Sequence, residues 1–582
     1  MLSPRPADDA PMDDSQTTIT AGEALLRRLK TLGVDHLFLN SGTDFPPIIE
    51  GLARAEGDPG AHLPEPVIAP HEHAAMGMAH GYFLATGRAQ AVMVHTNVGL
   101  ANAAIGALNA ASGNVPTILC SGRTPVTESG RFGGRLNPIN WGQEMRDQHA
   151  LVREAAKWDF ELRASEQTAD VIDRAYAIAN SLPRGPVYLS LPREVLCETV
   201  SPVRLAAPPE LAASTYVPRP GDIERAALIL ARATRPLIIG QRGPGGADGF
   251  ATLARLAEDW AMPVVEYWPT QMSLSTEHPM HAGYDPGAKL AEADAVLVID
   301  AQTPWAPAHH APPSGCPVIQ IGQDPLFART PVRGFPSDIA LPGDVGQVLG
   351  GLANAMAAHL EGQADAIAAR RPALVENNDK ARAQRHQQAA DGCGEPMSKG
   401  WVARCVGALS EEHDSIVLSE LGCQLADMTL TRPSCYFQEP HSGGLGWGLT
   451  AALGMQLAAR ERLIVATMGD GSYMFANPVA CHQIAEAYDL PLLTIVLNNS
   501  GWNAVRHATL ALYPDGAAAR ANVMPLAGFS PSPDFVKVAE STRSYAERVE
   551  RGADLPAALE RARHAIQQDR RQALLDVQVA AD

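Results

Sequence analysis

The chain lacks the cysteine spacing of a stapled or zinc-bound fold. Its eight cysteines are scattered over 582 residues, and no two of them form a Cys-x-x-Cys pair. This spacing excludes a disulfide framework and a cysteine zinc site. Scattered single cysteines are typical of proteins in a reducing compartment, so we expect a cytoplasmic location.

The sequence also shows no basic stripe, no signal-peptide pattern in its first residues and no uninterrupted long apolar run. The formal net charge of −18, without a basic stripe, argues against a nucleic-acid partner. Residues 1–16 have no positively charged segment before an apolar core, so we expect a disordered tail and no signal peptide. Residues 89–122 contain no Asp, Glu, Lys or Arg, but asparagines and glycines interrupt them. A buried strand–helix–strand is therefore expected there, and no membrane partner.

One stretch carries the clearest chemistry. An apolar run at 462–468 indicates a buried strand and ends on Gly469-Asp470-Gly471-Ser472, and a second run at 491–497 ends on Asn498-Asn499. Each motif alone is a common turn. Together, they place a carboxylate and an amide at the carboxyl ends of neighbouring strands. Hard oxygen ligands beside backbone amides are typical of a Mg²⁺–diphosphate site.

Strand runs and helical periods alternate along the chain, which predicts an α/β fold of three doubly wound parallel-sheet domains. We expect these domains at 17–195, 215–355 and 398–582. A charged, Ala/Gln-rich linker is expected at 356–397. Gly243, Gly245 and Gly246 follow a strand of the second domain, and we interpret them as a simple turn in preference to a nucleotide loop.

Pro70-His71-Glu72-His73-Ala74-Ala75-Met76 resembles the catalytic-glutamate helix of one superfamily of thiamine-diphosphate (ThDP) enzymes. That superfamily includes pyruvate oxidase, acetolactate synthase and benzoylformate decarboxylase. Gly185-Pro186-Val187, Gly443-Gly444-Leu445-Gly446-Trp447-Gly448 and the 469–499 segment resemble its other motifs, in the same order. The resemblance extends from about residue 17 to the end. It implies pyrimidine-binding, central and diphosphate-binding domains, and active sites at the subunit interface of a homodimer or homotetramer.

The resemblance also implies individual roles. Glu72 would activate the aminopyrimidine, although a glutamate in a first helical turn is also favoured by the helix dipole alone. Asp470, Asn499 and the backbone carbonyl of Gly501 would bind Mg²⁺. The cofactor-binding positions that it implies are Gly422, Cys423, Gly443, Leu445, Gly469, Gly471, Ser472 and Asn499. FAD, which some relatives use, has no decisive signal and is not expected.

His95 is the second candidate catalytic residue. The segment from Val94 to Leu108 resembles the strand–loop–helix that carries the active-site histidine of benzoylformate decarboxylase. An imidazole there could donate a proton or steer a carboxylate. A histidine with satisfied hydrogen bonds at a strand end is the alternative. His71 and the run 143–148 resemble acetolactate synthase-like members more closely.

The substrate side is less well defined. Thr43 replaces the substrate-binding serine of benzoylformate decarboxylase, and Asn97, Gln143, Trp502 and Arg506 complete the candidate substrate residues. The small residues Ala504 and Ala508 favour a roomy pocket. The Ala-, Pro- and Gly-rich segment 507–534 is expected to be a loop that acts as a lid. Three further features could belong to the site but are more typical of a surface or interface, namely Arg131, Arg135 and the pair His309-His310.

These residues favour a ThDP- and Mg²⁺-dependent carbon–carbon lyase that acts on a 2-oxo acid, most simply a decarboxylase. An acetolactate synthase-like carboligase or a 2-hydroxyacyl(-CoA) lyase is the alternative. These enzymes differ in whether a proton or a carbonyl compound reaches the shared intermediate. A non-catalytic ThDP-binding relative is a remote third hypothesis, because Glu72, Asp470 and Asn499 are all present.

Overall fold

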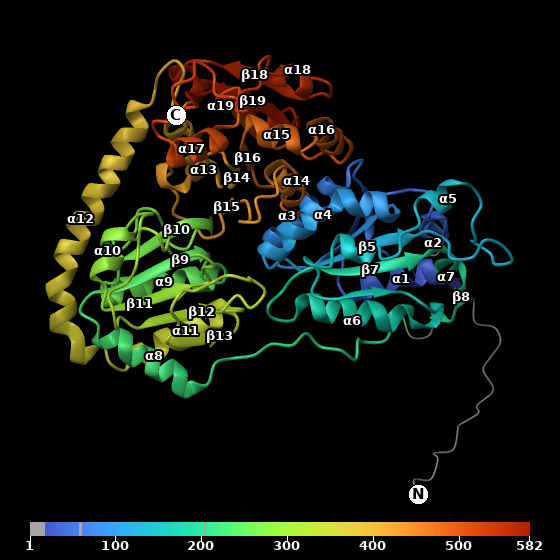
Figure 1. Ribbon diagram of the computed structural model, residues 1–582, viewed down its shortest axis with the longest axis horizontal. Helices are drawn as coiled ribbons and strands as arrows, with labels where there is room; N and C mark the ends of the chain where they lie inside the picture. Colours follow the sequence, from blue (N-terminus) through green and yellow to red (C-terminus); the bar gives the residue numbers. More distant parts are fainter. Residues whose placement is uncertain (1–17, 58–60, 203–204, 582) are drawn as a thin grey trace, which may run out of the picture.

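The computed structural model describes residues 18–57, 61–202 and 205–581 of the chain. The expected tail at 1–16 lies outside the described residues. The fold consists of three α/β lobes (Figure 1): an N-terminal lobe in blue and teal, a central lobe in green, and a C-terminal lobe in orange and red. The prediction of an α/β fold with parallel sheets is confirmed.

The N-terminal lobe is built on a six-stranded parallel sheet in the order β3-β2-β4-β5-β7-β6. Its strands are β2 (His36–Asn40), β3 (Glu65–Ile68), β4 (Gln90–Val94), β5 (Thr117–Arg123), β6 (Asp159–Glu161) and β7 (Val187–Pro192). A short pair, β1 (Ile19–Thr20) with β8 (Thr199–Val200), lies apart from the sheet. The helices are α1 (Ala21–Thr31), α2 (Pro46–Glu56), α3 (Glu72–Thr86), α4 (Thr96–Ser112), α5 (Ile139–Gly142), α6 (Thr168–Asn180) and α7 (Arg193–Cys197).

The central lobe has five strands, β9 (Pro236–Arg242), β10 (Val264–Gln271), β11 (Ala295–Ile299), β12 (Val318–Gly322) and β13 (Ile339–Pro342). All of them pair in parallel. Its helices are α8 (Pro220–Arg232), α9 (Gly246–Trp260), α10 (Gly287–Glu292) and α11 (Val345–Ala357). The charged segment after α11 forms α12 (Ala364–Asp391), which runs along the central and C-terminal lobes (Figure 1).

The C-terminal lobe contains β14 (Ile416–Glu420), β15 (Tyr436–Gln438), β16 (Ile464–Gly469), β17 (Leu493–Asn498), β18 (Tyr545–Val549) and β19 (Ala573–Gln578). The central and C-terminal sheets are continuous, because Gln271 of β10 pairs antiparallel with Phe437 of β15. The two sheets that the sequence predicts separately are therefore joined at their edges. The helices are α13 (Lys399–His413), α14 (Trp447–Ala458), α15 (Asp470–Phe475), α16 (Pro478–Ala487), α17 (Asn503–Leu512), α18 (Phe535–Ala539) and α19 (Leu555–Gln567).

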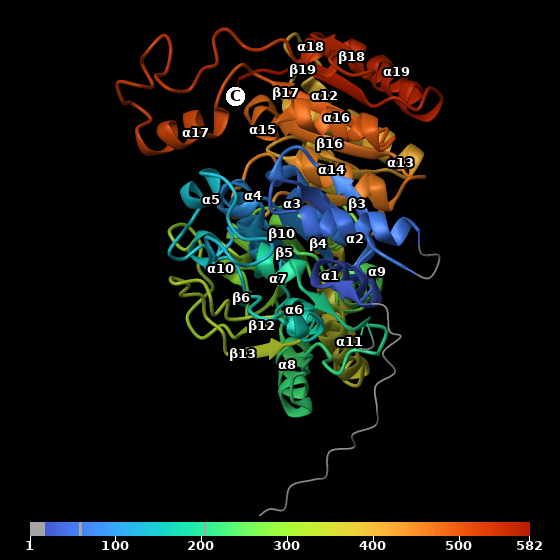
Figure 2. The same cartoon turned by 90° about the vertical axis from the view of Figure 1, so that its right-hand side faces the viewer.

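The expectation of a loop over 507–534 is wrong at its start, because α17 extends to Leu512. Val505 and Leu512 are seven residues apart, which is two helical turns, and polar residues lie between them. The segment is therefore locally compatible with a helix. Figure 2 shows α17 and the chain after it standing away from the rest of the C-terminal lobe.

Helices α3 and α14 join the N- and C-terminal lobes. Both are buried along most of their length, as expected of helices with apolar residues on all faces. A Cβ atom at Gly81 would overlap the carbonyl oxygen of Ala451, and one at Gly454 would overlap that of Met78. Glycine therefore allows the two backbones to meet. One apolar core, containing Phe38 of the first lobe and Trp447 of the third, runs across this contact.

Two simple properties complete the description. All eight cysteines are free. Within the described residues, no helix combines the length and apolar character needed to cross a membrane.

Candidate active site

Glu72 is the first residue of α3 and lies just beyond the carboxyl end of β3. Its side chain is buried, with one amide donor for each carboxylate oxygen. Asn40 Nδ2 donates to Oε1 at 2.9 Å and Asn102 Nδ2 donates to Oε2 at 3.0 Å. Gly99 contributes no side chain here, and a Cβ atom on it would lie 3.0 Å from Glu72 Oε1. The chain thus fixes a buried carboxylate and leaves lone pairs on both oxygens.

His95 lies at the carboxyl end of β4 and is the N-cap residue of α4. Its Nδ1 atom is hydrogen-bonded to the carboxylate of Asp44, and its Nε2 atom lies 3.1 Å from the side-chain nitrogen of Gln143. The Asp44 hydrogen bond raises the pKa of His95 above its ordinary value, burial opposes this, and the charges of Asp44 and Glu72 reinforce it. The imidazole is therefore more basic than an ordinary histidine.

Two candidate substrate residues of the N-terminal lobe, Thr43 and Asn97, lie close in sequence to Asp44 and His95 and make few side-chain contacts. Thr43 is exposed, and its backbone carbonyl accepts a hydrogen bond from Arg193 at 3.0 Å. Asn97, half-buried, accepts from the Thr96 hydroxyl at 3.4 Å. Gln143 is the substrate candidate that the structure brings onto His95. We call Asn40, Asp44, Glu72, His95, Asn102 and Gln143 the N-terminal cluster.

Asp470 opens α15 at the carboxyl end of β16 and is 2% exposed. Its Oδ1 atom accepts from the Gly471 N–H at 2.8 Å, and its Oδ2 atom accepts from the Gly501 N–H at 3.1 Å. Burial raises the pKa of Asp470, and these backbone donors lower it. The parallel pairing of β16 with β17 brings the half-buried Asn499 to the same edge of the sheet.

The Gly443–Gly446 loop is held from two directions. Asn109 of α4 donates from Nδ2 to the Gly444 carbonyl at 2.8 Å, and its Oδ1 atom accepts from the Gly444 N–H at 3.2 Å. From the end of β14, the buried carboxylate of Glu420 accepts hydrogen bonds from the N–H groups of Gly446 and Gly448 at 2.6 and 2.5 Å. Burial raises the pKa of Glu420 to about 7, against the lowering effect of these donors.

The other candidate cofactor-binding residues also lie in this region. Cys423 is buried and donates its backbone N–H to Thr467 Oγ1 at 3.1 Å, while a Cβ atom at Gly422 would lie 2.5 Å from the Thr467 backbone. Ser472 is buried and lies within hydrogen-bonding reach of Glu420. Leu445 is half-buried and Gly443 adopts a φ of +66°. We call residues 420–423, 443–448, 469–472 and 499–501 the C-terminal cluster.

Trp502 covers one side of this cluster. A Cβ atom at Gly471 would overlap its indole ring, which also packs at right angles to Phe529 with ring centroids 4.7 Å apart. Arg506, half-buried, follows one turn later on α17. Trp502 is thus the N-cap residue of α17, and Arg506 lies in its first turn.

The two clusters approach each other along α4, which carries Asn102 of the first and, through Asn109, holds Gly444 of the second. Among the described residues, no hydrogen bond links Glu72 or its asparagine partners to Asp470, Asn499 or Gly501. The two lobes are in contact through α3 and α14, through the hydrogen bonds of Asn109 with Gly444, and through a hydrogen bond from the Ile68 N–H to the Tyr488 hydroxyl. Each cluster contains part of the set of residues that the sequence predicts.

Several other residues lie outside both clusters. Arg131 is paired with Glu198, and Arg135 with Glu144. The His309 and His310 rings lie 6.2 Å apart in the central lobe. These arginines are engaged in ion pairs within the first lobe, as surface residues commonly are.

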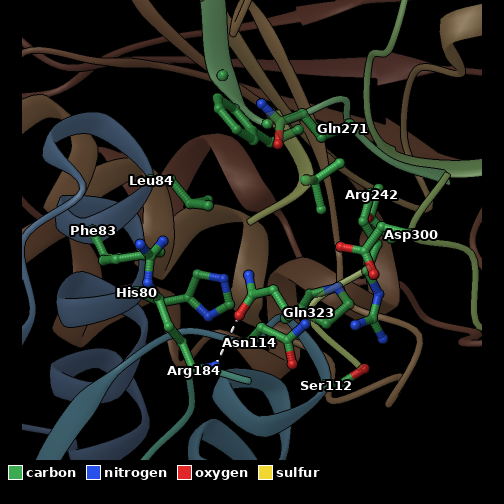
Figure 3. Close-up of a pocket in the computed structure, with 18 of the residues that line it drawn as sticks. His80, Phe83, Leu84, Ser112, Asn114, Arg184, Arg242, Gln271, Asp300 and Gln323 are labelled. Atoms are coloured by element: carbon green, nitrogen blue, oxygen red, sulfur yellow. Dashed lines mark hydrogen bonds between the residues drawn. The ribbon is translucent and has the colours of Figure 1, made fainter. Parts of the chain in front are cut away.

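A cavity of about 360 Å³ lies where the three lobes meet, beside the C-terminal half of α3 (Figure 3). His80, Arg184, Arg242 and Asp300 are part of its wall, and the Gly243–Gly246 turn lines it as well. Of the residues of the two clusters, only Trp447 lines it. The turn that the sequence predicts is therefore present, but it is also a cavity wall.

Sequence reasoning did not single out Asp44, Asn102, Asn109 or Glu420 as site residues. Asp44 follows Thr43 directly, in a turn that the sequence does mark. Glu420 ends the strand that begins with the apolar residues Ile416, Val417 and Leu418, a signal of the same kind as that of Asp470. Asn102 and Asn109 are polar residues on a helix that is otherwise rich in Ala and Gly. Their partners lie too far along the chain for local spacing to show the contacts.

The C-terminal cluster has the donor chemistry of a Mg²⁺–diphosphate site. Asp470, Asn499 and the Gly501 carbonyl are hard oxygen ligands. The Gly501 carbonyl accepts the Asn503 N–H at 3.1 Å and keeps a second lone pair. No group of three or more His, Cys, Asp or Glu within the described part of the chain could hold a metal ion. A cation here would take its remaining ligands from water or from the oxygens of a diphosphate.

Models of three thiamine pyrophosphate (the older name of ThDP) enzyme domains match the chain. The N-terminal TPP binding domain matches residues 19–151, the central domain matches 223–352, and the C-terminal TPP binding domain matches 420–577. The N- and C-terminal clusters fall mainly in the first and third of these matches.

Relatives with known names match nearly the whole chain. The probable 2-ketoarginine decarboxylase of Pseudomonas aeruginosa is 28% identical, over 93% of this chain and 90% of that protein. Benzoylformate decarboxylase of the same species is 27% identical, over 78% and 85%. The acetolactate synthase isozyme 3 large subunit of Escherichia coli is 26% identical, over 97% and 95%.

Solved structures show the same fold. The ThDP-dependent 4-hydroxybenzoylformate decarboxylase of Rhodococcus jostii matches with a TM-score of 0.74 at 23% identity, over 97% of this chain and 99% of that one. Benzoylformate decarboxylase of Polynucleobacter necessarius matches with a TM-score of 0.77 at 21% identity, with the same coverage. The predicted ThDP-dependent enzyme is confirmed by the three domain matches and by these relatives, and the chain belongs to the thiamine pyrophosphate enzyme family.

Proposed function

We propose that the protein is a ThDP- and Mg²⁺-dependent carbon–carbon lyase that decarboxylates a 2-oxo acid. The observation that carries this proposal is the N-terminal cluster, which brings together a buried carboxylate, Glu72, and a histidine, His95, that is hydrogen-bonded to Asp44 and has a raised pKa. A fixed carboxylate and a nearby acid are the two protein groups that this reaction requires.

Binding of the cofactor is assigned to the C-terminal cluster. Asp470, Asn499 and the Gly501 carbonyl would hold Mg²⁺, and the backbone around Gly471 and Ser472 would meet the diphosphate. Gly443 and Leu445 would contact the other end of the cofactor, supported by Asn109 and Glu420. The cofactor, when bound, supplies the carbanion and the electron sink that decarboxylation of a 2-oxo acid needs.

The N-terminal cluster would carry the proton transfers. Glu72 would exchange a proton with the aminopyrimidine of a bound cofactor, and Asn40 and Asn102 hold its carboxylate in place. His95 gives the proton that replaces CO₂ on the substrate carbon. Thr43, Asn97, Gln143, Trp502 and Arg506 would form the walls of the substrate pocket.

Each site is assigned to two chains, as the resemblance to other ThDP enzymes implies. A homodimer or homotetramer would bring the N-terminal cluster of one subunit to the C-terminal cluster of another. Large apolar side chains on a segment beside the N-terminal cluster remain uncovered, as expected of an assembly surface. They are Val126, Phe132, Leu136, Ile139 and Trp141. The cytoplasmic location stays a prediction from the cysteine pattern.

A carboligase is the second candidate function. It is favoured by the acetolactate synthase relative, which aligns with 97% of this chain. In such an enzyme, a second carbonyl compound would take the place of the proton from His95.

The test is a panel of substrates with the full chain, ThDP and Mg²⁺. The panel contains aliphatic, aromatic and guanidino 2-oxo acids and 2-hydroxyacyl-CoA esters, and CO₂ and aldehyde are measured separately. Equal amounts of CO₂ and aldehyde from one 2-oxo acid are expected. CO₂ accompanied by a hydroxyketone would favour the carboligase, and aldehyde without CO₂ would favour the acyl-CoA lyase. A chain that binds no ThDP in the presence of Mg²⁺ would contradict all three.

A further inference from the structure

Asp44 is a buried carboxylate that no sequence motif accounts for. It lies in the turn between β2 and α2 and is 3% exposed. One carboxylate oxygen is hydrogen-bonded to His95 Nδ1, and the other accepts from the Thr96 N–H at 3.4 Å. A buried carboxylate requires partners of this kind to offset its loss of hydration.

The backbone around this pair is shaped to admit it. A Cβ atom at Gly42 would overlap the His95 ring, and a Cβ atom at Gly122 of β5 would overlap the Asp44 carboxylate. Two glycines from separate segments therefore make room for one ion pair. This arrangement favours a specific role over an incidental contact.

A helix cap is the plainer interpretation of Asp44. His95 is the N-cap of α4 but its side chain makes no capping hydrogen bond, and Asp44 accepts one from Thr96 instead. At 3.4 Å this bond is long, whereas the contact with His95 Nδ1 is short. Since the N-terminus of a helix disfavours a nearby cation, Asp44 also offsets the effect of α4 on a protonated His95.

The opposite nitrogen of His95 faces the rest of the N-terminal cluster. The Gln143 side-chain nitrogen donates to an unprotonated Nε2 atom at 3.1 Å. Gln143 Oε1 is buried without a hydrogen-bond partner, so a rotated amide can accept from a protonated Nε2 atom. Gln143 thus suits both charge states of Nε2, while Asp44 suits only a protonated Nδ1.

We propose that Asp44 is a positioning residue that holds the proton of His95 on Nδ1 and thereby reserves Nε2 as the atom that donates to substrate. This inference rests on the decarboxylase function proposed above. In the step, the Nε2–H bond breaks and its proton forms a C–H bond at the carbon that has lost CO₂. The ring becomes neutral with Nδ1–H still donated to Asp44, which stays ionised. Solvent then restores the Nε2 proton.

The charged groups that face His95 are Asp44 from the β2–α2 turn and Glu72 from α3. Both favour the imidazolium, and the hydrogen bond with Asp44 contributes most to the raised pKa of His95. Replacing Asp44 by asparagine therefore lowers that pKa. The fraction of protonated His95 at a given pH falls, and the alkaline limb of the rate profile moves to lower pH.

The experiment measures hydrogen–deuterium exchange at the C2 position of His95 by mass spectrometry, as a function of pH, in the cofactor-free full chain. In the wild type, the exchange midpoint of His95 is expected above that of an unstructured histidine peptide. In Asp44→Asn it is expected at lower pH, with kcat reduced by about tenfold or more and the dissociation constant for ThDP unchanged. An unmoved midpoint together with an unmoved alkaline limb would overturn the proposal.

A matched control exists in the same lobe. Asp159 is hydrogen-bonded to His149 Nδ1 at 2.6 Å, away from both clusters. Asp159→Asn is expected to leave the His95 midpoint and kcat unchanged. Asp44→Asn is expected to add no further loss in a His95→Gln background, since the two residues act as one unit. A full additional loss there would overturn the proposal in favour of a simple helix cap.

The outcomes separate this proposal from the proposed function. If Asp44→Asn does not fold, the exchange midpoint of His95 in the wild type still tests the proposal. A midpoint at or below that of the unstructured peptide would overturn the positioning role of Asp44. If the midpoint shifts but no 2-oxo acid releases CO₂, the proposed function and its proton transfer fail, although Asp44 still orients His95. If CO₂ is released while the midpoint and rate are insensitive to Asp44, the positioning role alone fails.

Discussion

Asn109 and Gly444 form a reciprocal pair of hydrogen bonds between the N-terminal and C-terminal lobes. The side-chain nitrogen of Asn109 donates to the Gly444 carbonyl at 2.8 Å, and the Gly444 N–H donates to Asn109 Oδ1 at 3.2 Å. Asn109 lies on α4, the helix that begins beside His95. A single helix therefore borders the N-terminal cluster and also fixes the loop that belongs to the C-terminal cluster.

Asn109→Ala is expected to lower the affinity of the chain for ThDP in the presence of Mg²⁺. The loop at 443–446 would lose its hydrogen bonds with α4. We expect this loss to raise the dissociation constant for ThDP by roughly tenfold. Isothermal titration calorimetry measures this. Asn180→Ala, which removes a hydrogen bond within α6 only, is the control. Equal dissociation constants for Asn109→Ala and the wild type would show that the loop does not need Asn109.

Gly81→Ala is expected to destabilise the contact between α3 and α14. The added methyl group would overlap the Ala451 carbonyl, and such overpacking costs about 1–3 kcal/mol. A lower thermal midpoint is the readout. Gly350→Ala is the matched control, because Gly350 also lies within a helix but has nothing within 4 Å of its Cβ position. That variant should be as stable as the wild type or slightly more stable. A Gly81→Ala protein with the same thermal midpoint as the wild type would contradict this packing.

Glu420 predicts a stability that depends on pH. Burial raises its pKa from 4.5 to about 7, so the folded protein holds this proton more tightly than the unfolded chain. The resulting stabilisation is fully present below about 4.5 and is lost as pH rises through about 7. It amounts to a free energy on the order of 3 kcal/mol. Glu439, whose pKa is raised well above its ordinary value by burial and by the charge of Glu420, acts in the same direction.

The measurement is the thermal midpoint of the cofactor-free chain from pH 4.5 upward. We expect the midpoint of the wild type to fall through this interval and that of Glu420→Gln to fall less. Glu540→Gln, at an exposed position, should follow the wild type. Identical slopes for Glu420→Gln and the wild type would refute the assignment.

Mixed dimers test the assignment of each site to two chains. Glu72→Gln and Asp470→Ala are each expected to be inactive as homodimers. Co-expressed, they should recover about a quarter of wild-type activity, because random pairing gives mixed dimers in half of the cases, each with one intact site. Glu72→Gln with His95→Gln is the control, since both substitutions affect the same cluster and no intact site can form. A mixture that stays inactive would place both clusters of a site on one chain.

The sequence predicted the fold class and the two ends of the candidate site, because these depend on local pattern. Asp470 and Asn499 follow apolar strands, and parallel pairing then brings them to one edge of the sheet. Glu72 follows a strand and opens a helix, as expected. Gln143 was chosen by resemblance, and the structure brings it to His95. Their roles in the reaction stay predictions.

What the sequence could not predict depends on contacts between distant segments. Asn109 and Gly444 are 335 positions apart, and no periodicity connects them. Asp44 is one residue beyond Thr43, yet only the fold shows that its side chain turns inward to His95 while Thr43 is exposed. The joining of two sheets through Gln271 and Phe437 rests on a single residue pair, which leaves no pattern in either strand.

The most direct test of the account compares the wild type with Glu72→Gln in the presence of Mg²⁺ and saturating ThDP. The measurement is CO₂ release from the best 2-oxo acid of the panel, with bound ThDP determined in the same samples. We expect Glu72→Gln to bind ThDP and to release CO₂ about a hundredfold to ten-thousandfold more slowly than the wild type. A Glu72→Gln chain that releases CO₂ at the wild-type rate, or a ThDP-loaded wild type that releases none, would contradict the account.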